Sequence, residues 1–275
     1  MRAPKKSFRR IDVAFLVYLL HRRKLIFHKQ NGENNPKRHL RSTFLLQRSS
    51  TLLRKEGESA LKVLAINGSP RKKWNTATLL QKTLEGAASQ GAVTELIHLY
   101  DLNFKGCVSC FACKTIGGTS YGRCAHRDDL TPILEKLPET DVLILGSPIY
   151  FGSVTGEMQS FLERLQFPFL PYADPPSSLF PGKIRTGFIY TMNVDENVAR
   201  QFGFSARIEL NEFFLKLVFG NSESLCSFDT YQFDDYSRVF APRWDSEKKA
   251  KRRMEIFPED CSRAFELGKR LASNG

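Results

Sequence analysis

Four of the six cysteines in this 275-residue chain lie close together in the sequence. They are Cys107, Cys110, Cys113 and Cys124, so that two gaps of two residues are followed by one gap of ten. Thiolates are soft ligands that favour iron–sulfur clusters and zinc, and closely spaced turns can aim successive sulfurs at one centre. The segment is therefore a candidate site for a [4Fe–4S] cluster.

Two other interpretations of these cysteines stay open. A zinc ion could use the same four ligands, or His126 could replace one of them. The thiols could also stay free of metal and line a pocket or a contact between subunits. Six cysteines are too few for a disulfide scaffold in a chain of this length, and their crowding favours a reducing compartment, which we expect to be the cytoplasm.

A second candidate site is the loop that follows the apolar run 61–66. Residues 67–77 read NGSPRKKWNTA, which combines hydroxyl groups, basic side chains and the free N–H groups of a helix that begins near Thr76. Such a combination can bind a phosphate group. The same residues are also compatible with an ordinary turn in which Asn75 or Thr76 only caps the helix.

A third candidate is the loop at residues 146–156, which reads GSPIYFGSVTG. Its aromatic residues Tyr150 and Phe151 lie between Pro148 and Gly152. They could stack on a flat ligand ring while backbone N–H groups bind the polar edge of that ring. Alternatively, the two aromatic side chains could cover the edge of a sheet as part of the core.

The elements that must position these loops alternate between strand and helix patterns. Strands are expected over 61–66, 93–97, 142–145, 186–192 and 224–228. Helices are expected from Thr76 onward, over 130–137, over 156–166, around Phe213, Phe214, Leu217 and Val218, and around Cys261, Phe265, Leu267 and Leu271. This alternation predicts an α/β fold with a parallel sheet and helices on both faces. Ligands bind beyond the carboxyl ends of such strands, so both loops should face one site.

The two loops together resemble those of the NADPH-dependent FMN reductase group of the flavodoxin-like superfamily, which includes the iron-sulfur flavoproteins. The motifs that carry the resemblance are NGSPR with Asn75 and Thr76, and GSPIYFG at 146–152. It covers residues 61–275. The resemblance implies a flavodoxin-like three-layer sandwich, with a five-stranded parallel sheet in the order 2-1-3-4-5.

In that family the first loop holds the phosphate of FMN and the second lies along its isoalloxazine ring. Carried over by position, the implied phosphate contacts are Ser69, Arg71, Asn75, Thr76 and Ala77. The implied ring contacts are Pro148, Ile149, Tyr150, Phe151 and Gly152. FMN would supply the redox chemistry, so no catalytic acid or base is nominated. Iron-sulfur flavoproteins carry a compact cysteine motif at a similar place, with a last gap shorter than the ten residues found here.

The formal net charge of +12 comes almost wholly from the N-terminal part of the chain. Residues 1–60 hold 15 of the 41 lysines and arginines but only four acids, so we expect a basic, disordered extension there and an FMN-binding domain over 61–275. The apolar run 13–20 is too short to cross a bilayer. The basic run at 247–253 is expected to be a solvated helix face, so no nucleic acid and no membrane span are predicted.

These observations predict an FMN-dependent NAD(P)H oxidoreductase that passes electrons to a small acceptor such as a quinone, a flavin or a redox protein. The resemblance implies a homodimer or homotetramer. The alternative is an iron-sulfur flavoprotein that acts as a non-enzymatic electron carrier or redox sensor. Nucleic-acid binding is a weaker third hypothesis that rests on the basic extension alone.

Overall fold

The computed structural model describes residues 60–273, so the expected disorder of residues 1–59 lies outside the described residues. Five strands form one sheet in the order β2-β1-β3-β4-β5, and every pairing is parallel. The strands are β1 (Lys62–Asn67), β2 (Val93–His98), β3 (Val142–Pro148), β4 (Ile184–Thr191) and β5 (Gly220–Ser227). The predicted fold class and strand order are confirmed.

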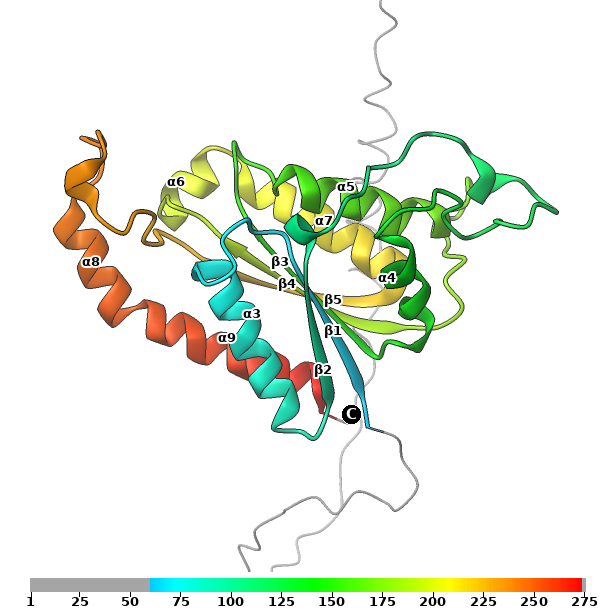
Figure 1. Cartoon of the computed structure of the whole chain (residues 1–275), viewed down its shortest axis with the longest axis horizontal. Coiled ribbons are helices and arrows are strands. Elements are labelled where there is room, and N and C mark those ends of the chain that lie inside the picture. The colour runs from blue at the N-terminus through cyan, green and yellow to red at the C-terminus, as the bar shows by residue number, and fades with distance from the viewer. Residues whose placement is uncertain (1–59, 274–275) are drawn as a thin grey trace, which may run out of the picture. The chain divides into compact units, whose positions relative to one another are not determined.

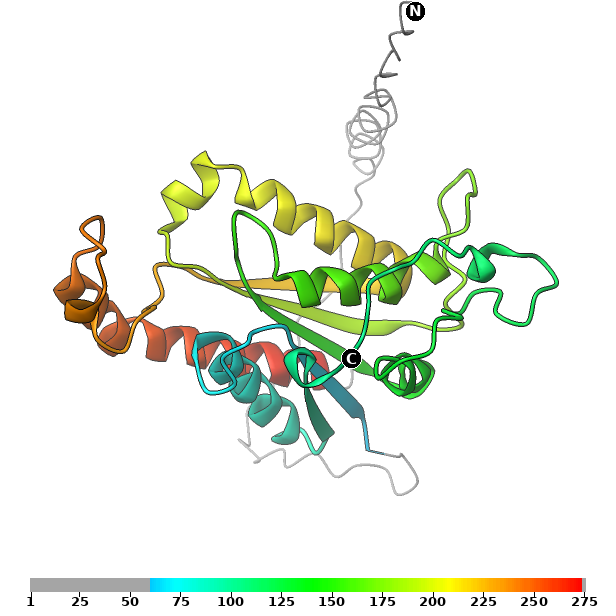
Figure 2. The same ribbon diagram turned by 45° about the horizontal axis from the view of Figure 1, so that its top comes forward.

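Helices cover both faces of this sheet (Figures 1 and 2). They are α3 (Asn75–Ala88), α4 (Thr131–Lys136), α5 (Gly156–Gln166), α6 (Glu196–Gln201), α7 (Phe204–Phe219), α8 (Ser246–Glu255) and α9 (Phe257–Ala272). One face is packed against α3 and α9, and the other against α4, α5 and α7. No helix in this part of the chain is long and apolar enough to cross a membrane.

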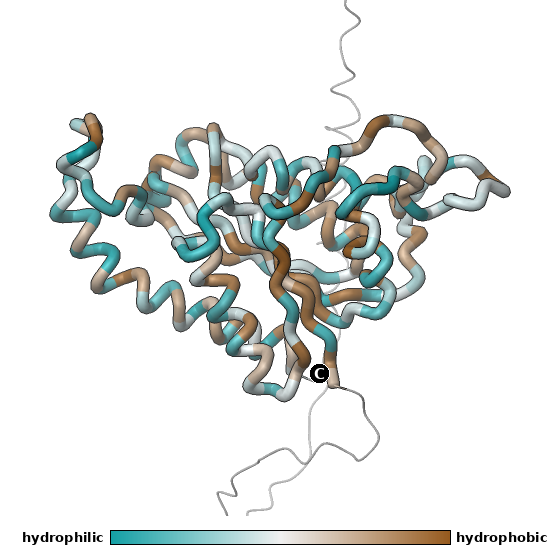
Figure 3. The backbone as a smooth tube through the Cα atoms, viewed as in Figure 1, coloured by the Kyte–Doolittle hydropathy of each residue, from teal (hydrophilic) through white to brown (hydrophobic). Residues whose placement is uncertain are grey.

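The strand β1 shows why a continuous apolar run folds in this way. Successive side chains of a strand point to opposite faces. Val63 and Ala65 therefore join the core under α3 and α9, while Leu64 and Ile66 join the core under α5 and α7. All four are buried, and Figure 3 shows hydrophobic residues concentrated along the central strands. Both faces of the strand need apolar side chains, so the sequence does not alternate.

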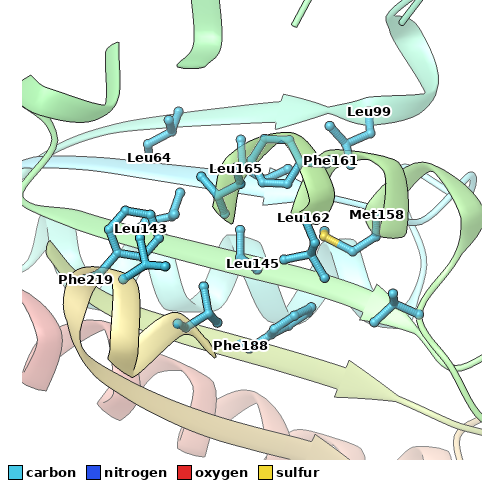
Figure 4. Packing of buried hydrophobic residues seen from close by; sticks show 14 of the residues in the cluster. Leu64, Leu99, Leu143, Leu145, Met158, Phe161, Leu162, Leu165, Phe188 and Phe219 are labelled. Atoms are coloured by element: carbon cyan, nitrogen blue, oxygen red, sulfur yellow. The ribbon is translucent and has the colours of Figure 1, made fainter. Parts of the chain in front are cut away.

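The helix α5 has the bounds that its sequence pattern predicts. The four residues expected on its buried face, Met158, Phe161, Leu162 and Leu165, are all buried. Figure 4 shows them beside the leucines of β1 and β3. This packing fixes the helix that follows the candidate loop at residues 146–156.

Two expectations about the C-terminal half are wrong in detail. The last strand, β5, begins at Gly220, four residues before the predicted start at residue 224. In α7 the buried residues are Leu215, Val218 and Phe219, whereas the predicted Phe213 is 37% exposed. The sequence of β5 is polar because it is an edge strand, so its first half carries no apolar signal.

Candidate functional site

The turns that follow β1, β3, β4 and β5 meet at the carboxyl edge of the sheet around a cavity of about 140 Å³. Seven of the ten residues implied as FMN contacts line this cavity. They are Ser69, Arg71, Asn75, Thr76, Pro148, Ile149 and Tyr150. Of the other three, Ala77 is buried in the first turn of α3, and Phe151 and Gly152 line a neighbouring cavity. The structure therefore brings the two candidate loops together, as their positions after strands predict.

The first loop is shaped by hydrogen bonds from the side chain of Asn67, the last residue of β1. Its Oδ1 accepts a hydrogen bond from the N–H of Ser69 (3.0 Å), and its Nδ2 donates to Nδ1 of His98 at the end of β2 (2.8 Å). Burial lowers the pKa of His98, against an opposing effect of Asp101, which favours a neutral ring that can accept. Sequence reasoning gave neither Asn67 nor His98 a role.

The helix α3 begins at this loop with its first N–H groups free. Its N-cap residue is Trp74, whose side chain makes no capping hydrogen bond. The first N–H groups of a helix have no acceptor within the helix, and its dipole favours an anion beside them. Asn75 and Thr76 belong to the first turn, so the alternative in which either one caps the helix is wrong.

The turn after β5 is tied to the first loop by three side-chain donors. Arg71 Nη1 donates to the carbonyl of Gln232 (2.5 Å), and Trp74 Nε1 (3.0 Å) and Asn75 Nδ2 (2.8 Å) both donate to the carbonyl of Tyr231. The side-chain amide of Asn75 is thus engaged within the protein. As a phosphate contact, Asn75 can offer its main-chain N–H. The sequence feature that could have identified this turn as part of the site is its position directly after the last predicted strand.

The second loop ends in a tight turn with an aromatic residue at its tip. Tyr150 and Ser153 exchange N–H···O hydrogen bonds of 2.7 and 3.0 Å, and between them Phe151 and Gly152 have φ of 50° and 80°. Two successive positive φ values are typical of a type I′ turn, which suits Gly152 but strains Phe151. The Phe151 ring is fully exposed, so the turn holds an aromatic side chain out towards solvent.

Thr155 joins the second loop to the first. It is the N-cap of α5, where its Oγ1 accepts from the N–H of Met158 (3.3 Å) and donates to the carbonyl of Gly68 (2.7 Å). Its own N–H donates to Oγ of Ser147 (3.1 Å). The two candidate loops are therefore held in a fixed relation by one buried hydroxyl.

A second cavity, of about 530 Å³, lies next to the first. The two share Ile149, Met192 and Asn193. The larger cavity is otherwise lined by apolar, aromatic and basic residues, namely Phe151, Gly152, Val194, Phe202, Gly203, Phe204 and Arg207. The edge of the sheet thus offers an anion-binding end beside an aromatic end.

The residues at these cavities fit FMN by the chemistry of their donors. The uncapped start of α3, the buried hydroxyls of Ser69 and Thr76 and the cation of Arg71 suit a phosphate monoester. The exposed turn at residues 150–153, which we call the aromatic turn, suits a flat ring.

The cysteine loop, by which we mean residues 105–126, is held against α5 by a buried arginine. The Arg164 side chain is 0% exposed and pairs with Asp128. Its Nε donates to Sγ of Cys124 (3.3 Å), and its other nitrogens donate to the carbonyls of Lys105 (3.1 Å) and His126 (2.7 Å). Both ends of the cysteine loop are therefore held by one guanidinium.

A lysine fastens the middle of the same loop. Lys114 Nζ donates to the carbonyls of Phe167 and Leu170, just after α5, the latter at 2.6 Å. The N–H of Cys107 donates to Oε2 of Glu163 (3.1 Å). The cysteine loop is thus an ordered part of the fold that lies along α5.

Among residues 60–273, the four thiols of this loop do not form a metal site. Burial raises the pKa of the Cys113 thiol, Lys114 lowers it, and the other three cysteines raise it further. Over residues 60–273, however, no three His, Cys, Asp or Glu side chains are placed to hold a metal ion together. The four-cysteine ligand set therefore stays a prediction.

Backbone strain marks the same loops. The non-glycine residues with positive φ in the described part of the chain are Ser109, Phe111, Phe151 and Asp229. The first two lie in the cysteine loop, Phe151 lies in the second loop, and Asp229 lies in the turn after β5. Residues held in this conformation cluster at functional sites, where the surrounding structure compensates for their cost.

The expectation that the basic run 247–253 is a solvated face is wrong for three of its residues. Lys249 is 3% exposed and pairs with Asp229, Arg252 is 13% exposed and pairs with Asp260, and Arg253 is half-buried beside Asn75. The partners of Lys249 and Arg253 lie 20 and 178 residues away in the sequence, and that of Arg252 lies eight residues away on the next helix, so the periodicity of this helix alone could not reveal them.

Comparison with known proteins shows which family the sequence resembles. Residues 61–191 match the model of the family described as NADPH-dependent FMN reductase. An iron-sulfur flavoprotein of Methanocaldococcus jannaschii is 39% identical over 104 residues, which cover 38% of this chain and 51% of that protein. One from Archaeoglobus fulgidus is 41% identical over 104 residues, which cover 38% of this chain and 48% of that protein. The chain spans about half the length of these relatives.

Solved structures share the fold. The NAD(P)H:quinone oxidoreductase from Methanothermobacter marburgensis superposes with a TM-score of 0.59 at 14% identity, covering 78% of this chain and all of that one. An azoreductase from Bacillus anthracis gives 0.55 at 11% identity, covering 76% and 99%. Residues 61–191, which contain both candidate loops, are thus similar in sequence to the NADPH-dependent FMN reductase family, and the described part of the chain has a flavodoxin-like fold.

Proposed function

We propose that this protein binds FMN at the carboxyl edge of the sheet and acts as an NAD(P)H-dependent oxidoreductase. The observation that carries the proposal is the pair of adjoining cavities, one formed at the free N–H groups of α3 and the other beside the aromatic turn. A phosphate at one end and a flat ring at the other are the two features of FMN. The match to the FMN reductase family supports the same cofactor.

FMN, when bound, supplies the capacity to accept a hydride and pass electrons on. The chain's own residues bind and orient it. The N–H groups of Asn75, Thr76 and Ala77 would hold the phosphate. The turn from Pro148 to Gly152 would lie along the ring. The main-chain N–H groups of Phe151 and Gly152, which have no hydrogen-bond partner among the described residues, would meet its polar edge.

The large cavity leaves room for a second, smaller molecule beside the ring. Arg207 lines it and has no carboxylate partner among the described residues, so an acceptor or donor with a negative charge would be favoured there. We propose a small acceptor such as a quinone, a flavin or a redox protein. Names of the structural neighbours include a quinone oxidoreductase and an azoreductase.

We also propose that the protein is a homodimer or homotetramer in the cytoplasm. Phe151 and Phe202 are exposed beside the larger cavity, and large apolar side chains grouped in this way suit contact with a second copy. The six cysteines are all unpaired, which supports a reducing compartment.

A second candidate function is that of an electron carrier or redox sensor with an iron–sulfur cluster. The names of the curated relatives favour it. It requires the cysteine loop to rearrange so that Cys107, Cys110, Cys113 and Cys124 share one centre. Iron, zinc and sulfide analysis of anaerobically purified protein separates it from the metal-free form.

The reductase is tested by adding NADH or NADPH to the FMN-loaded protein without oxygen. We expect the visible flavin absorbance to bleach with at least one of the two, and to return when a quinone is added. A flavin that neither nucleotide reduces would contradict the proposal.

A pair of phenylalanine variants tests the ring contact. Phe151→Ala should lower kcat/KM by about tenfold, which corresponds to about 1.4 kcal/mol of lost binding to the transition state. Phe240→Ala removes another highly exposed ring, remote from the aromatic turn in sequence, and should leave kcat/KM unchanged.

A further inference from the structure

The helix α8 lies outside the segment that matches the family model, yet it contacts the turns of the flavin site. Its residues Lys249 and Arg253 are one helical turn apart and so lie on one face. Each makes hydrogen bonds to a loop that lines the small cavity.

Lys249 anchors α8 to the turns after β4 and β5. Its Nζ donates to the carbonyl of Asn193 (2.9 Å), to Oδ1 of Asn193 (2.6 Å) and to Oδ1 of Asp229. Three acceptors match the three N–H groups of an ammonium ion. The Trp244 ring lies over this ion, with its centroid 4.6 Å from Nζ. The charged group is therefore fully satisfied and fixes the helix in place.

Arg253 reaches the first turn of α3. Its Nη1 donates to Oδ1 of Asn75 (2.8 Å), while Nδ2 of the same amide donates to the carbonyl of Tyr231 (2.8 Å). The guanidinium also lies over the ring of Phe257, at 4.1 Å from the centroid. Both the oxygen and the nitrogen of the Asn75 amide are hydrogen-bonded, so Arg253 helps to fix the side chain of the first residue of α3.

Two guanidinium groups flank Trp74 at this end of the cavity. The Cζ of Arg71 lies 5.2 Å from the Trp74 ring centroid, and that of Arg253 lies 5.8 Å away. Within residues 60–273 neither guanidinium has a carboxylate partner, although α8 carries acidic residues. The positive charge is thus left available to a ligand beside the free N–H groups of α3.

We propose that α8 acts as a latch, meaning that it holds the start of α3 in place at the phosphate end of the flavin site. In this latch, Arg253 is the positioning residue that makes the site prefer FMN to riboflavin. The inference rests on the proposed function. Arg253 orients Asn75 and adds to the positive potential around the phosphate dianion. Riboflavin has the same ring but lacks this dianion, so Arg253 does not favour it.

The test is a titration of FMN, and separately of riboflavin, with flavin-free protein. Binding is measured by the quenching of flavin fluorescence. We compare the wild type with Arg253→Met. The matched control is Lys251→Met, which removes one positive charge from the exposed side of the same helix. In Arg253→Met the Kd for FMN should rise about tenfold or more, while the Kd for riboflavin stays within about twofold. Lys251→Met should leave both values unchanged.

Three results would overturn the latch. The first is an equal change for FMN and riboflavin in Arg253→Met, and the second is an equal loss of FMN affinity in Lys251→Met. The third is unchanged FMN affinity in Arg253→Met. A wild type that binds neither flavin overturns the proposed function, and the latch with it, so the two failures are distinguishable.

Riboflavin binding also reports whether the variant is folded. If Arg253→Met does not fold, Asn75→Ala removes the amide that Arg253 holds and should give the same selective loss of FMN. Retention of the full preference for FMN in Asn75→Ala would overturn the latch.

Discussion

At the scale of single residues, the ion pair of the buried Arg164 with Asp128 has an electrostatic consequence that can be measured. Burial by itself raises the pKa of Asp128. Hydrogen bonds from Arg164 and from the N–H groups of Lys105 and Leu130 outweigh it and bring the pKa below its ordinary value of 3.8. A carboxyl whose pKa is depressed by folding stabilises the fold above its unfolded pKa, and that stabilisation is lost as the pH falls through the folded pKa.

We therefore predict that Arg164→Met lowers the free energy of unfolding by about 3–5 kcal/mol at pH 7, because it leaves the Asp128 carboxylate, which is only 12% exposed, without its charged partner. The variant should regain part of this difference below pH 4, where the carboxyl group becomes neutral. Urea unfolding at both pH values measures the effect.

The control is Arg127→Met, whose ion pair with Glu135 is exposed on both sides. Exposed pairs contribute little, so this variant should unfold like the wild type. Equal stability of Arg164→Met and the wild type at pH 7 would show that the buried pair is not holding the cysteine loop.

The residues of the two ligand loops could be predicted because they follow apolar strands directly. The roles of Lys249 and Arg253 could not, since Asp229, Asn193 and Asn75 lie 20, 56 and 178 residues away from them. A run of basic residues on a helix looks the same in the sequence whether its partners are water or distant carboxylates. Asn67 was missed for the same reason, because its partner His98 ends a different strand.

At the scale of elements, the position of α3 depends on its close contact with α9. A Cβ atom on Gly268 would lie 1.8 Å from the carbonyl oxygen of Thr83, and one on Gly86 would lie 1.9 Å from that of Phe265. Such contacts with backbone cannot be relieved by rotating a side chain. The two helices thus touch through glycines, side by side under the sheet (Figure 1).

The variant Gly268→Ala distinguishes the effect of this helix contact from that of helix propensity, because the two change the free energy of unfolding in opposite directions. Alanine in a helix interior is normally favoured over glycine by about 0.5–1 kcal/mol. Here we predict destabilisation by about 1–3 kcal/mol or more, because the added methyl group forces α3 away from α9. Thermal or urea unfolding gives the sign directly.

Gly182→Ala provides the reference, because nothing lies within 4 Å of its Cβ position. It should leave the unfolding midpoint nearly unchanged. A Gly268→Ala variant that is more stable than the wild type would mean that the two helices are not in contact as described.

The central strands and α5 could be predicted because each buries a continuous or regularly spaced apolar set. The edge strand β5 could not be placed accurately, since Asn221, Ser222 and Glu223 in its first half are polar. In α7 apolar residues occur on more than one side, so the pattern did not identify the buried side. Its residues Leu210 and Phe213 are exposed.

At the scale of the whole molecule, the candidate site lies at one edge of the sheet. The first loop, the aromatic turn, the turns after β4 and β5 and the helix α8 all meet there, although they are spread over residues 67–253. The family match ends at residue 191. The part that follows supplies Tyr231, Gln232, Lys249 and Arg253, so the site needs the C-terminal segment as well.

The central claim is that FMN binds with its phosphate at the start of α3 and its ring along the aromatic turn. Hydrogen–deuterium exchange of the protein with and without FMN tests it most directly, because bound phosphate protects the N–H groups that the helix leaves free. We predict slower exchange in peptides containing residues 75–77 and 148–152. FMN that binds without protecting either segment, or that protects a different part of the chain, would contradict the account.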